Sequence, residues 1–113
     1  MKPRSPVRKV NPERKAREWT RAYGSVERCQ FVQSLPCAVP YCNGSPRENA
    51  HTEGGGMGRK ADYTTITSLC PTHHSLLHRH GVATFYALFG IDLRHAAALT
   101  ERAWQRHLNG ETT

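Results

Sequence analysis

Three cysteines and one histidine stand at spacings typical of zinc ligands. They form the pairs Cys37-x4-Cys42 and Cys70-x2-His73. Zinc prefers a tetrahedral set of thiolate and imidazole ligands, and an ion bound by four protein ligands leaves no position for a reacting water. We therefore predict a structural zinc site that joins the two pairs. His74 is the alternative fourth ligand, because it lies one residue further along, but the x2 spacing favours His73.

A pair of histidines, His74 and His78, follows in the same segment. Residues four apart share one face of a helix, so these two imidazoles can bind one metal ion. His73 is rotated by about 100° from His74 and points elsewhere. Two protein ligands leave other coordination positions open, which distinguishes a catalytic ion from a structural one. The sequence thus predicts two metal sites on one short helix.

The helix that carries both sites is delimited by Pro71 and Gly81. Proline suits the first helical turn, and glycine suits the position after the last. A short strand over 47–53 and a β-branched segment over 63–69 predict a hairpin before this helix, with a glycine-rich loop between them. After Gly81, the segment 82–89 is predicted to be a further helix or a continuation after a bend.

Helical patterns flank this central region on both sides. Asn11 and Pro12 predict the start of a helix that Gly24 ends, and a weaker helical pattern spans 26–34. A last helix is expected over 93–108, where Asp92 is a good N-cap. The residues expected to face the core are Val26, Cys29 or Gln30, and Val32 or Gln33 in the second helix, and Leu93, Ala97, Thr100, Trp104 and Leu108 in the last.

The order of these residues resembles the ββα-metal fold of HNH endonucleases. In that fold a cysteine pair, a hairpin that carries a histidine, and a helix beginning C-x2-[CH]-H-x3-H follow one another. The segments that carry the resemblance are S-L-P-C at 34–37, E-N-A-H at 48–51, G-G-M-G-R-K at 55–60 and L-C-P-T-H-H at 69–74. They are similar to small HNH-type proteins often carried by phages and prophages, and the similarity covers about residues 25–90.

The resemblance implies an α+β fold, with a small ββα-metal (HNH-type) core and a zinc knuckle flanked by N- and C-terminal helices. We expect a disordered basic arm over 1–12 and N-terminal helices over 13–34. The zinc-stabilised core would span 35–81, and C-terminal helices over 82–110 would pack on it.

The resemblance also implies a metal-dependent DNA endonuclease. His51 would act as the general base, while His74 and His78 would hold Mg²⁺, Mn²⁺ or another divalent ion. Cleavage would leave 5′ phosphate and 3′ hydroxyl ends. A monomer would nick one strand, and a double-strand cut would need a homodimer or two separate events. The residues expected to contact phosphates are Arg59, Lys60 and Arg79.

Two positions depart from the family pattern. Ala50 stands where the family has Asp or His as a third metal ligand, and no Asn lies near Thr64 and Thr65 to orient the base. If the register shifts by one, His51 becomes the ligand and Thr52 takes the place of the base, although a hydroxyl is a poor base near neutral pH. The nearby acids that could complete the ligands of the ion are Glu53 and Asp62.

The charge of the chain favours a polyanionic partner. Lys and Arg number 16 against 9 Asp and Glu, and most of the excess lies in residues 1–21. Such an arm is expected either for a protein that binds a polyanion or for a solvated terminus that aids solubility, and the two predicted metal sites favour DNA as the partner. No secretory signal and no membrane-length apolar run is visible, which predicts a cytoplasmic protein, in the host cytoplasm if phage-encoded. The alternative function is a non-catalytic zinc-binding module that binds DNA or a phage assembly partner.

Overall fold

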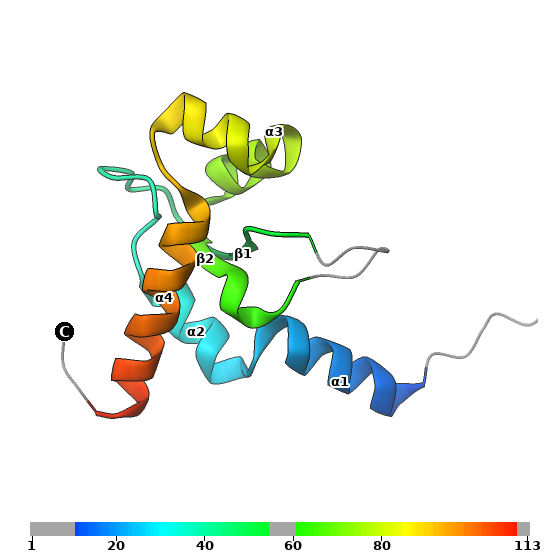
Figure 1. Ribbon diagram of the computed structural model, residues 1–113. Helices are drawn as coiled ribbons and strands as arrows, with labels where there is room; N and C mark the ends of the chain where they lie inside the picture. The colour runs from blue at the N-terminus through cyan, green and yellow to red at the C-terminus, as the bar shows by residue number, and fades with distance from the viewer. Residues whose placement is uncertain (1–10, 55–60, 111–113) are drawn as a thin grey trace, which may run out of the picture.

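The structure is a computed structural model that describes residues 11–54 and 61–110. Four α-helices, a two-stranded antiparallel sheet and one 3₁₀ turn make up this part of the chain, which confirms the predicted α+β class (Figure 1). In chain order the elements are α1 (Pro12–Tyr23), α2 (Val26–Ser34), β1 (Glu48–His51), η1 (Tyr63–Thr65), β2 (Ile66–Leu69), α3 (Pro71–Phe89) and α4 (Leu93–Leu108). Within the described ranges, no helix combines the length and apolarity needed to cross a membrane.

The predicted hairpin forms, with His51 of β1 opposite Ile66 of β2. Its second strand begins three residues later than the predicted segment 63–69. The reason is local, because the Asp62 carboxylate accepts a hydrogen bond from the backbone N–H of Thr64 at 2.9 Å and the chain turns into η1. The sheet is therefore short, and His51 lies at the end of it.

Alternation along β1 places its four side chains on two faces of the strand. Asn49 and His51 share one face of the strand, and Glu48 and Ala50 share the other. Ala50 is fully buried in the main core cluster. That cluster comprises Cys37, Ala50, Leu69, Cys70, Leu77, Phe85 and Leu93. Two cysteines of the predicted zinc site are thus part of the hydrophobic core.

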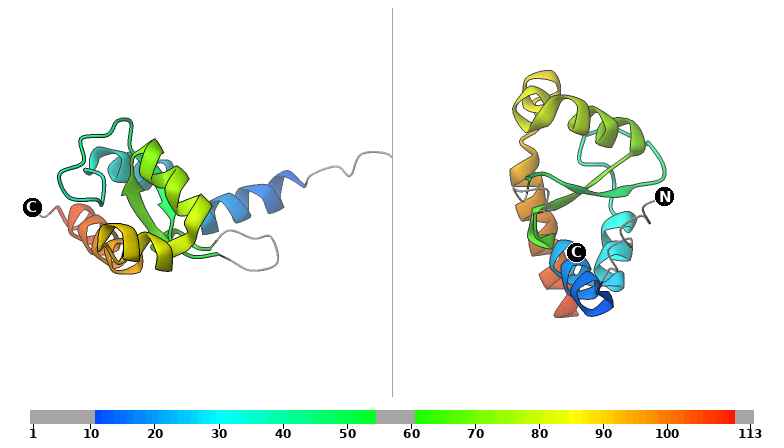
Figure 2. Two further views of the ribbon diagram at one scale, coloured as in Figure 1. Left: turned by 90° about the horizontal axis from the view of Figure 1, so that it is seen from above. Right: turned by 90° about the vertical axis from the view of Figure 1, so that its right-hand side faces the viewer.

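Helix α3 lies across the hairpin, and the two views of Figure 2 show it covering one side of the strands. Cys70 is its N-cap and Pro71 its first residue, as the sequence predicts. Gly81 interrupts the helix with φ 83° and ψ 170°, a backbone conformation that glycine adopts without steric cost. The segment 82–89 is therefore a continuation of the helix after a bend, one of the two alternatives that the sequence left open.

The last helix, α4, packs against β2 and η1. Four residues of its predicted stripe are buried, namely Leu93, Ala97, Thr100 and Trp104. The prediction was wrong for Leu108, which is 57% exposed, because the final turn of α4 extends beyond the elements it covers. Leu108 therefore contributes little to the core.

The inward face of α2 also differs from the prediction. Val32 is buried as expected, but Val26 is 56% exposed and Arg28 takes the inward position instead. The guanidinium of Arg28 pairs with Glu101 of α4 at 3.3 Å and lies over the Tyr63 ring, 5.1 Å from its centroid. A charged side chain can occupy this place because both an anion and an aromatic face are present.

Candidate functional site

The four predicted zinc ligands come together in one cluster. Cys37 and Cys42 lie on the segment between α2 and β1, and Cys70 and His73 lie at the start of α3. The four ligand atoms all lie within 4.8 Å of one another. The Sγ atoms of Cys42 and Cys70 are 3.8 Å apart, and the Sγ atoms of Cys37, Cys42 and Cys70 lie 3.6, 3.5 and 3.2 Å from Nδ1 of His73.

These separations fit a tetrahedral zinc ion. With Zn–S about 2.3 Å and Zn–N about 2.05 Å, a regular tetrahedron places two sulfurs about 3.8 Å apart and a sulfur and a nitrogen about 3.6 Å apart. The distances in the cluster match these edges within a few tenths of an ångström. The chain can therefore hold a metal ion such as zinc here, with His73 rather than His74 as the fourth ligand.

Backbone N–H groups point at the sulfurs of the cluster. Gly44 donates to Cys42 at 3.4 Å, Cys70 donates to Cys37 at 3.5 Å, and His73 donates to Cys70 at 3.5 Å. The N–H of Gly44 lowers the pKa of the Cys42 thiol, whereas burial raises the pKa of the Cys37 thiol. Metal binding would supply the charge that keeps Cys37 as a thiolate.

The surroundings of the cluster are closed. Cys37 and Cys70 are buried, and the His73 ring meets Phe85 and Phe89 edge-on, with centroids 6.2 and 5.1 Å away. A Cβ atom on Gly44 would lie 2.5 Å from Cβ of Cys70 and 2.8 Å from its sulfur. Only glycine fits at that point, so the turn after Cys42 is shaped by its contact with the ligands.

The second histidine pair forms on the neighbouring face of α3. The Nε2 atoms of His74 and His78 are 3.1 Å apart. Two adjacent ligands about 2.1 Å from an octahedral ion would be about 3.0 Å apart. Without an ion the same geometry is a hydrogen bond in which His78 donates and His74 accepts. An ion between the two nitrogens would replace that shared proton.

Glu48 forms a hydrogen bond with the ring nitrogen of His74 that does not face His78. Its Oε1 lies 2.9 Å from Nδ1 of His74, so Nδ1–H donates to the carboxylate and Nε2 is the nitrogen that faces His78. A carboxylate behind a metal-binding histidine fixes its tautomer and raises its basicity. The sequence analysis did not assign Glu48. Glu48 could have been found from its position two residues before Ala50, because residues two apart lie on the same face of a strand. Helix α3 covers that face.

His51 is fixed by the last turn of α1. Its Nε2 lies 2.7 Å from the carbonyl oxygen of Ala22, which can only accept, so Nε2 carries the hydrogen. The lone pair of the neutral ring is then on Nδ1. The Tyr23 ring meets the imidazole edge-on, with centroids 5.1 Å apart. The orientation of His51 therefore depends on contacts with α1.

The three histidines His51, His74 and His78 line one pocket of about 590 Å³. The hairpin contributes His51, and α3 contributes the other two. The pocket is also lined by Tyr23, Asn49, Thr52, Glu53, Gly54, Leu77, Gly81, Val82, Ala83 and Arg94. A space of this size is open to a phosphodiester and to water.

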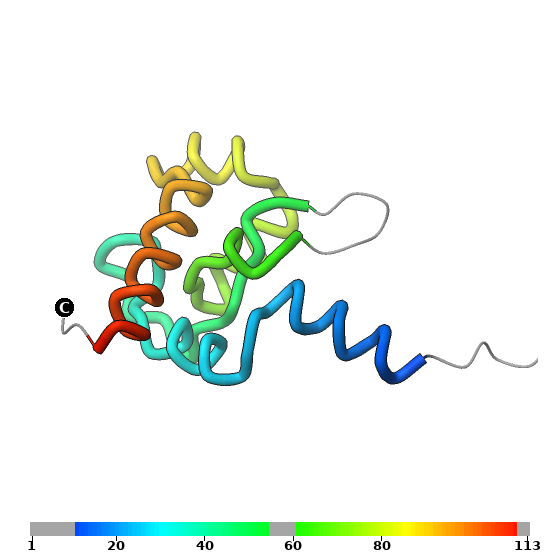
Figure 3. The backbone as a smooth tube through the Cα atoms, turned by 60° about the horizontal axis from the view of Figure 1, so that its bottom comes forward, coloured from blue at the N-terminus to red at the C-terminus, as the bar shows by residue number. Residues whose placement is uncertain are grey.

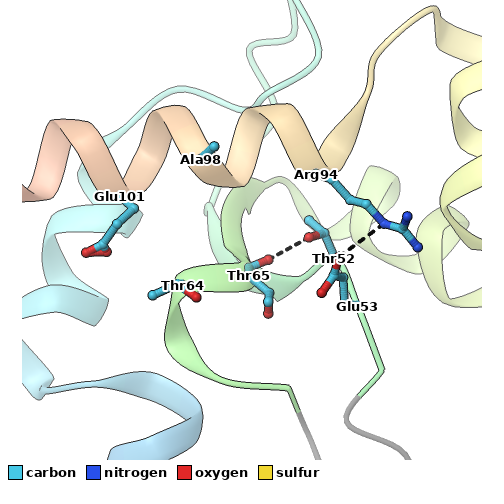
Figure 4. A pocket seen from close by; sticks show the side chains of 7 residues that line it. All are labelled: Thr52, Glu53, Thr64, Thr65, Arg94, Ala98 and Glu101. Atoms are coloured by element: carbon cyan, nitrogen blue, oxygen red, sulfur yellow. Dashed lines mark hydrogen bonds and ion pairs between the residues drawn. The ribbon is translucent and has the colours of Figure 1, made fainter.

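Thr52 is engaged in the hairpin. Its hydroxyl donates to the carbonyl of Thr65 at 2.7 Å, and its side chain and backbone are buried (Figure 4). This hydroxyl is buried, and an alcohol is a very weak base near neutral pH, so Thr52 is unsuited to the role of base in the shifted register. The residues that line the adjoining pocket of about 340 Å³ in Figure 4 are Thr52, Glu53, Thr64, Thr65, Arg94, Ala98 and Glu101.

The two acids considered as further ligands have different surroundings. Asp62 caps η1 and does not line the three-histidine pocket. Glu53 lies at the rim of that pocket, where its Oε1 pairs with Nε of Arg94 at 3.2 Å. Arg94 lines both pockets and was not singled out in the sequence. It places a guanidinium at the boundary of the two pockets, paired with Glu53.

The remaining predicted residues lie elsewhere. Arg79 is exposed on α3, and Arg59 and Lys60 lie outside the described residues. Cys29 is not part of the zinc cluster, in agreement with the sequence analysis. Its thiol lies 3.8 Å from the carbonyl of Tyr23, and burial raises its pKa.

Comparisons with known protein families, with characterised proteins and with solved structures found no match to this chain. What the chain does must therefore follow from its own side chains. Two arrangements carry chemistry, the closed cluster of Cys37, Cys42, Cys70 and His73 and the open pocket that His51, His74 and His78 share.

Proposed function

We propose that the chain is a metal-dependent DNA endonuclease of the HNH type, which hydrolyses phosphodiester bonds and nicks one strand. The observation that carries the proposal is that His51, His74 and His78 line the same pocket, with the two Nε2 atoms on α3 only 3.1 Å apart. The cluster of three cysteines and His73 is a separate, structural zinc site that fixes the start of α3.

Different residues of the pocket have different roles in the hydrolysis. His74 and His78 would hold a divalent ion, which would supply Lewis-acid stabilisation of the charge on the phosphate and on the leaving oxygen. His51 takes a proton through Nδ1 from the attacking water. The carbonyl of Ala22 orients the ring and stabilises the imidazolium that forms, since Nε2–H already points at it.

The bond changes define the products. The water oxygen forms a bond to phosphorus while the bond from phosphorus to the 3′ oxygen breaks. The 3′ oxygen takes up a proton from solvent water and becomes a hydroxyl, and the fragment on the other side of the break keeps the phosphate at its 5′ end. One pocket cuts one strand, so a monomer nicks, and a double-strand break needs a dimer or two separate events.

The test is plasmid nicking with Mg²⁺, Mn²⁺, Ni²⁺ and Zn²⁺ added in turn. Wild-type protein should convert supercoiled plasmid to the open-circular form, and His51→Ala should lower the rate by about 10²- to 10⁴-fold. His74→Ala should also lose activity. The matched control is His80→Ala, which removes an exposed histidine of the same helix that does not line the pocket. Equal cutting by all four proteins would identify a contaminating nuclease.

A second candidate function is that of a zinc-stabilised, non-catalytic module that binds DNA or a phage assembly partner. The observation that favours it is the environment of Ala50, which is buried in the core where the family has a metal ligand. The nearby amide of Asn49 donates to the carbonyl of Cys29 at 3.1 Å and holds α2 to the hairpin. This candidate predicts that His51→Ala leaves DNA binding unchanged and that wild-type protein nicks with none of the ions.

A further inference from the structure

Arg94 lies on the first turn of α4, outside the segment that resembles HNH proteins. Its backbone N–H donates to the carboxylate of Asp92 at 3.0 Å, so the start of the helix fixes where the side chain leaves the backbone. Figure 3 shows α4, in orange to red, leaving the end of α3, and the helix packs along the strand β2. This packing brings Arg94 to the three-histidine pocket, which it helps to line.

The side chain of Arg94 is only partly engaged. Its Nε lies 3.2 Å from Oε1 of Glu53, and Figure 4 shows the arginine reaching from α4 to this carboxylate. Among the residues that the structure describes, neither terminal nitrogen of Arg94 makes a hydrogen bond or an ion pair. The two side chains are 66% and 45% exposed, and such a pair contributes little free energy. Most N–H donors of the guanidinium are therefore open to a ligand.

The charges of the pocket single out the same side chain. Of the described residues that line the three-histidine pocket, Arg94 is the only lysine or arginine and Glu53 is the only acid. A guanidinium binds a phosphate through two parallel N–H···O bonds, which Arg94 has free donors to make. Glu53 would repel that phosphate, and without Arg94 its carboxylate would be the one permanent charge among these lining residues.

We propose that Arg94 binds a phosphate of the DNA strand that occupies the three-histidine pocket. The contact is made to the backbone and not to the bases, so it serves every DNA sequence equally. Arg79, the described arginine that the sequence suggested for this role, is exposed on α3 and does not line the pocket. The inference rests on the proposed function for the identity of the pocket, and it names the side chain that holds the substrate there.

The test measures DNA binding without cleavage. Fluorescence anisotropy of two labelled duplexes of unrelated sequence is followed at several NaCl concentrations, with zinc-loaded protein and no other divalent ion added. Arg94→Ala should weaken binding to both duplexes about tenfold at 0.1 M salt, and should reduce the slope of log affinity against log salt by about 1. Arg94→Lys should keep the wild-type slope, since the positive charge remains.

The matched control is Arg102→Ala, which removes an exposed arginine about two turns further along α4 that lines neither pocket. This variant loses the same charge as Arg94→Ala and should keep the wild-type slope. Glu53→Gln should tighten binding, because the carboxylate that repels a phosphate is gone, whereas Glu27→Gln on the exposed side of α2 should not. Equal slopes in the two arginine variants, or Glu53→Gln binding no tighter than Glu27→Gln, overturns the proposal.

The binding measurement separates this contact from the nuclease activity. A protein that nicks no plasmid but shows the expected changes in Arg94→Ala would refute the nuclease and leave Arg94 as a phosphate contact. A protein that nicks plasmid while Arg94→Ala binds both duplexes like Arg102→Ala would overturn the contact alone.

Discussion

The Nδ1 atom of His74 lies 2.9 Å from Oε1 of Glu48, across the interface between α3 and β1. This contact fixes which nitrogen of His74 faces His78, and so it determines whether two imidazoles on one helix can share an ion. Metal-binding histidines are commonly held in this way by an acceptor behind the ring. Glu48 therefore positions the ring of His74.

Replacing Glu48 should weaken binding of the divalent ion without affecting the zinc cluster. We expect Glu48→Ala to lower Mn²⁺ affinity by about 10- to 100-fold, because the His74 ring loses its anchor. Glu48→Gln should lose less, since the amide oxygen still accepts from Nδ1–H. Isothermal titration calorimetry on zinc-loaded protein measures both. Affinities equal to wild type in both variants would contradict the role given to Glu48.

Removing one histidine of the pair should abolish the open site alone. In His78→Ala the protein keeps a single imidazole there, and we expect no Mn²⁺ binding that calorimetry detects. The zinc content, measured by atomic emission, should remain at one ion per chain. His80→Ala serves as the control and should bind Mn²⁺ normally. Simultaneous loss of zinc and Mn²⁺ in His78→Ala would show that the two sites are not separate.

Loss of the zinc cluster should unfold the domain. Cys37 and Cys70 belong to the core cluster, so an empty site would leave thiols and an imidazole inside apolar surroundings. We expect Cys70→Ser and treatment with a strong chelator to remove most of the helical circular dichroism signal. Cys29→Ser should retain both zinc and fold, because Cys29 lies outside the cluster. A fully folded Cys70→Ser protein without zinc would refute the structural role.

The glycine that follows the cysteine knuckle should tolerate no side chain. Gly44→Ala places a methyl group 2.5 Å from Cβ of Cys70, and either the turn or the start of α3 must move. We expect a loss of stability of about 1–3 kcal/mol together with weaker zinc retention. Gly54→Ala is the control, because a methyl group there meets nothing within 4 Å. Urea unfolding of the zinc-loaded proteins measures the difference, and similar stabilities would contradict this account of the turn.

Much of the local structure could be predicted because it depends on neighbouring residues. Asn11 with Pro12, and Cys70 with Pro71, start α1 and α3 where the sequence indicates, since caps and proline act within a few residues. The spacing of the zinc ligands limited the set to two candidates for the histidine. The β-branched segment before β2 misled the prediction, because the side chain of Asp62 forms a turn that β propensity does not reveal.

The sequence by itself determined the two metal-binding patterns, since ligand type and helical spacing are properties of short segments. Only the tertiary structure brought Glu48 behind His74, the carbonyl of Ala22 against His51, and Arg28 into the interior beside Glu101. These contacts join residues 26, 29 and 73 positions apart. No local propensity encodes them, because they arise only when packing of the apolar faces has fixed how the helices and the hairpin lie together.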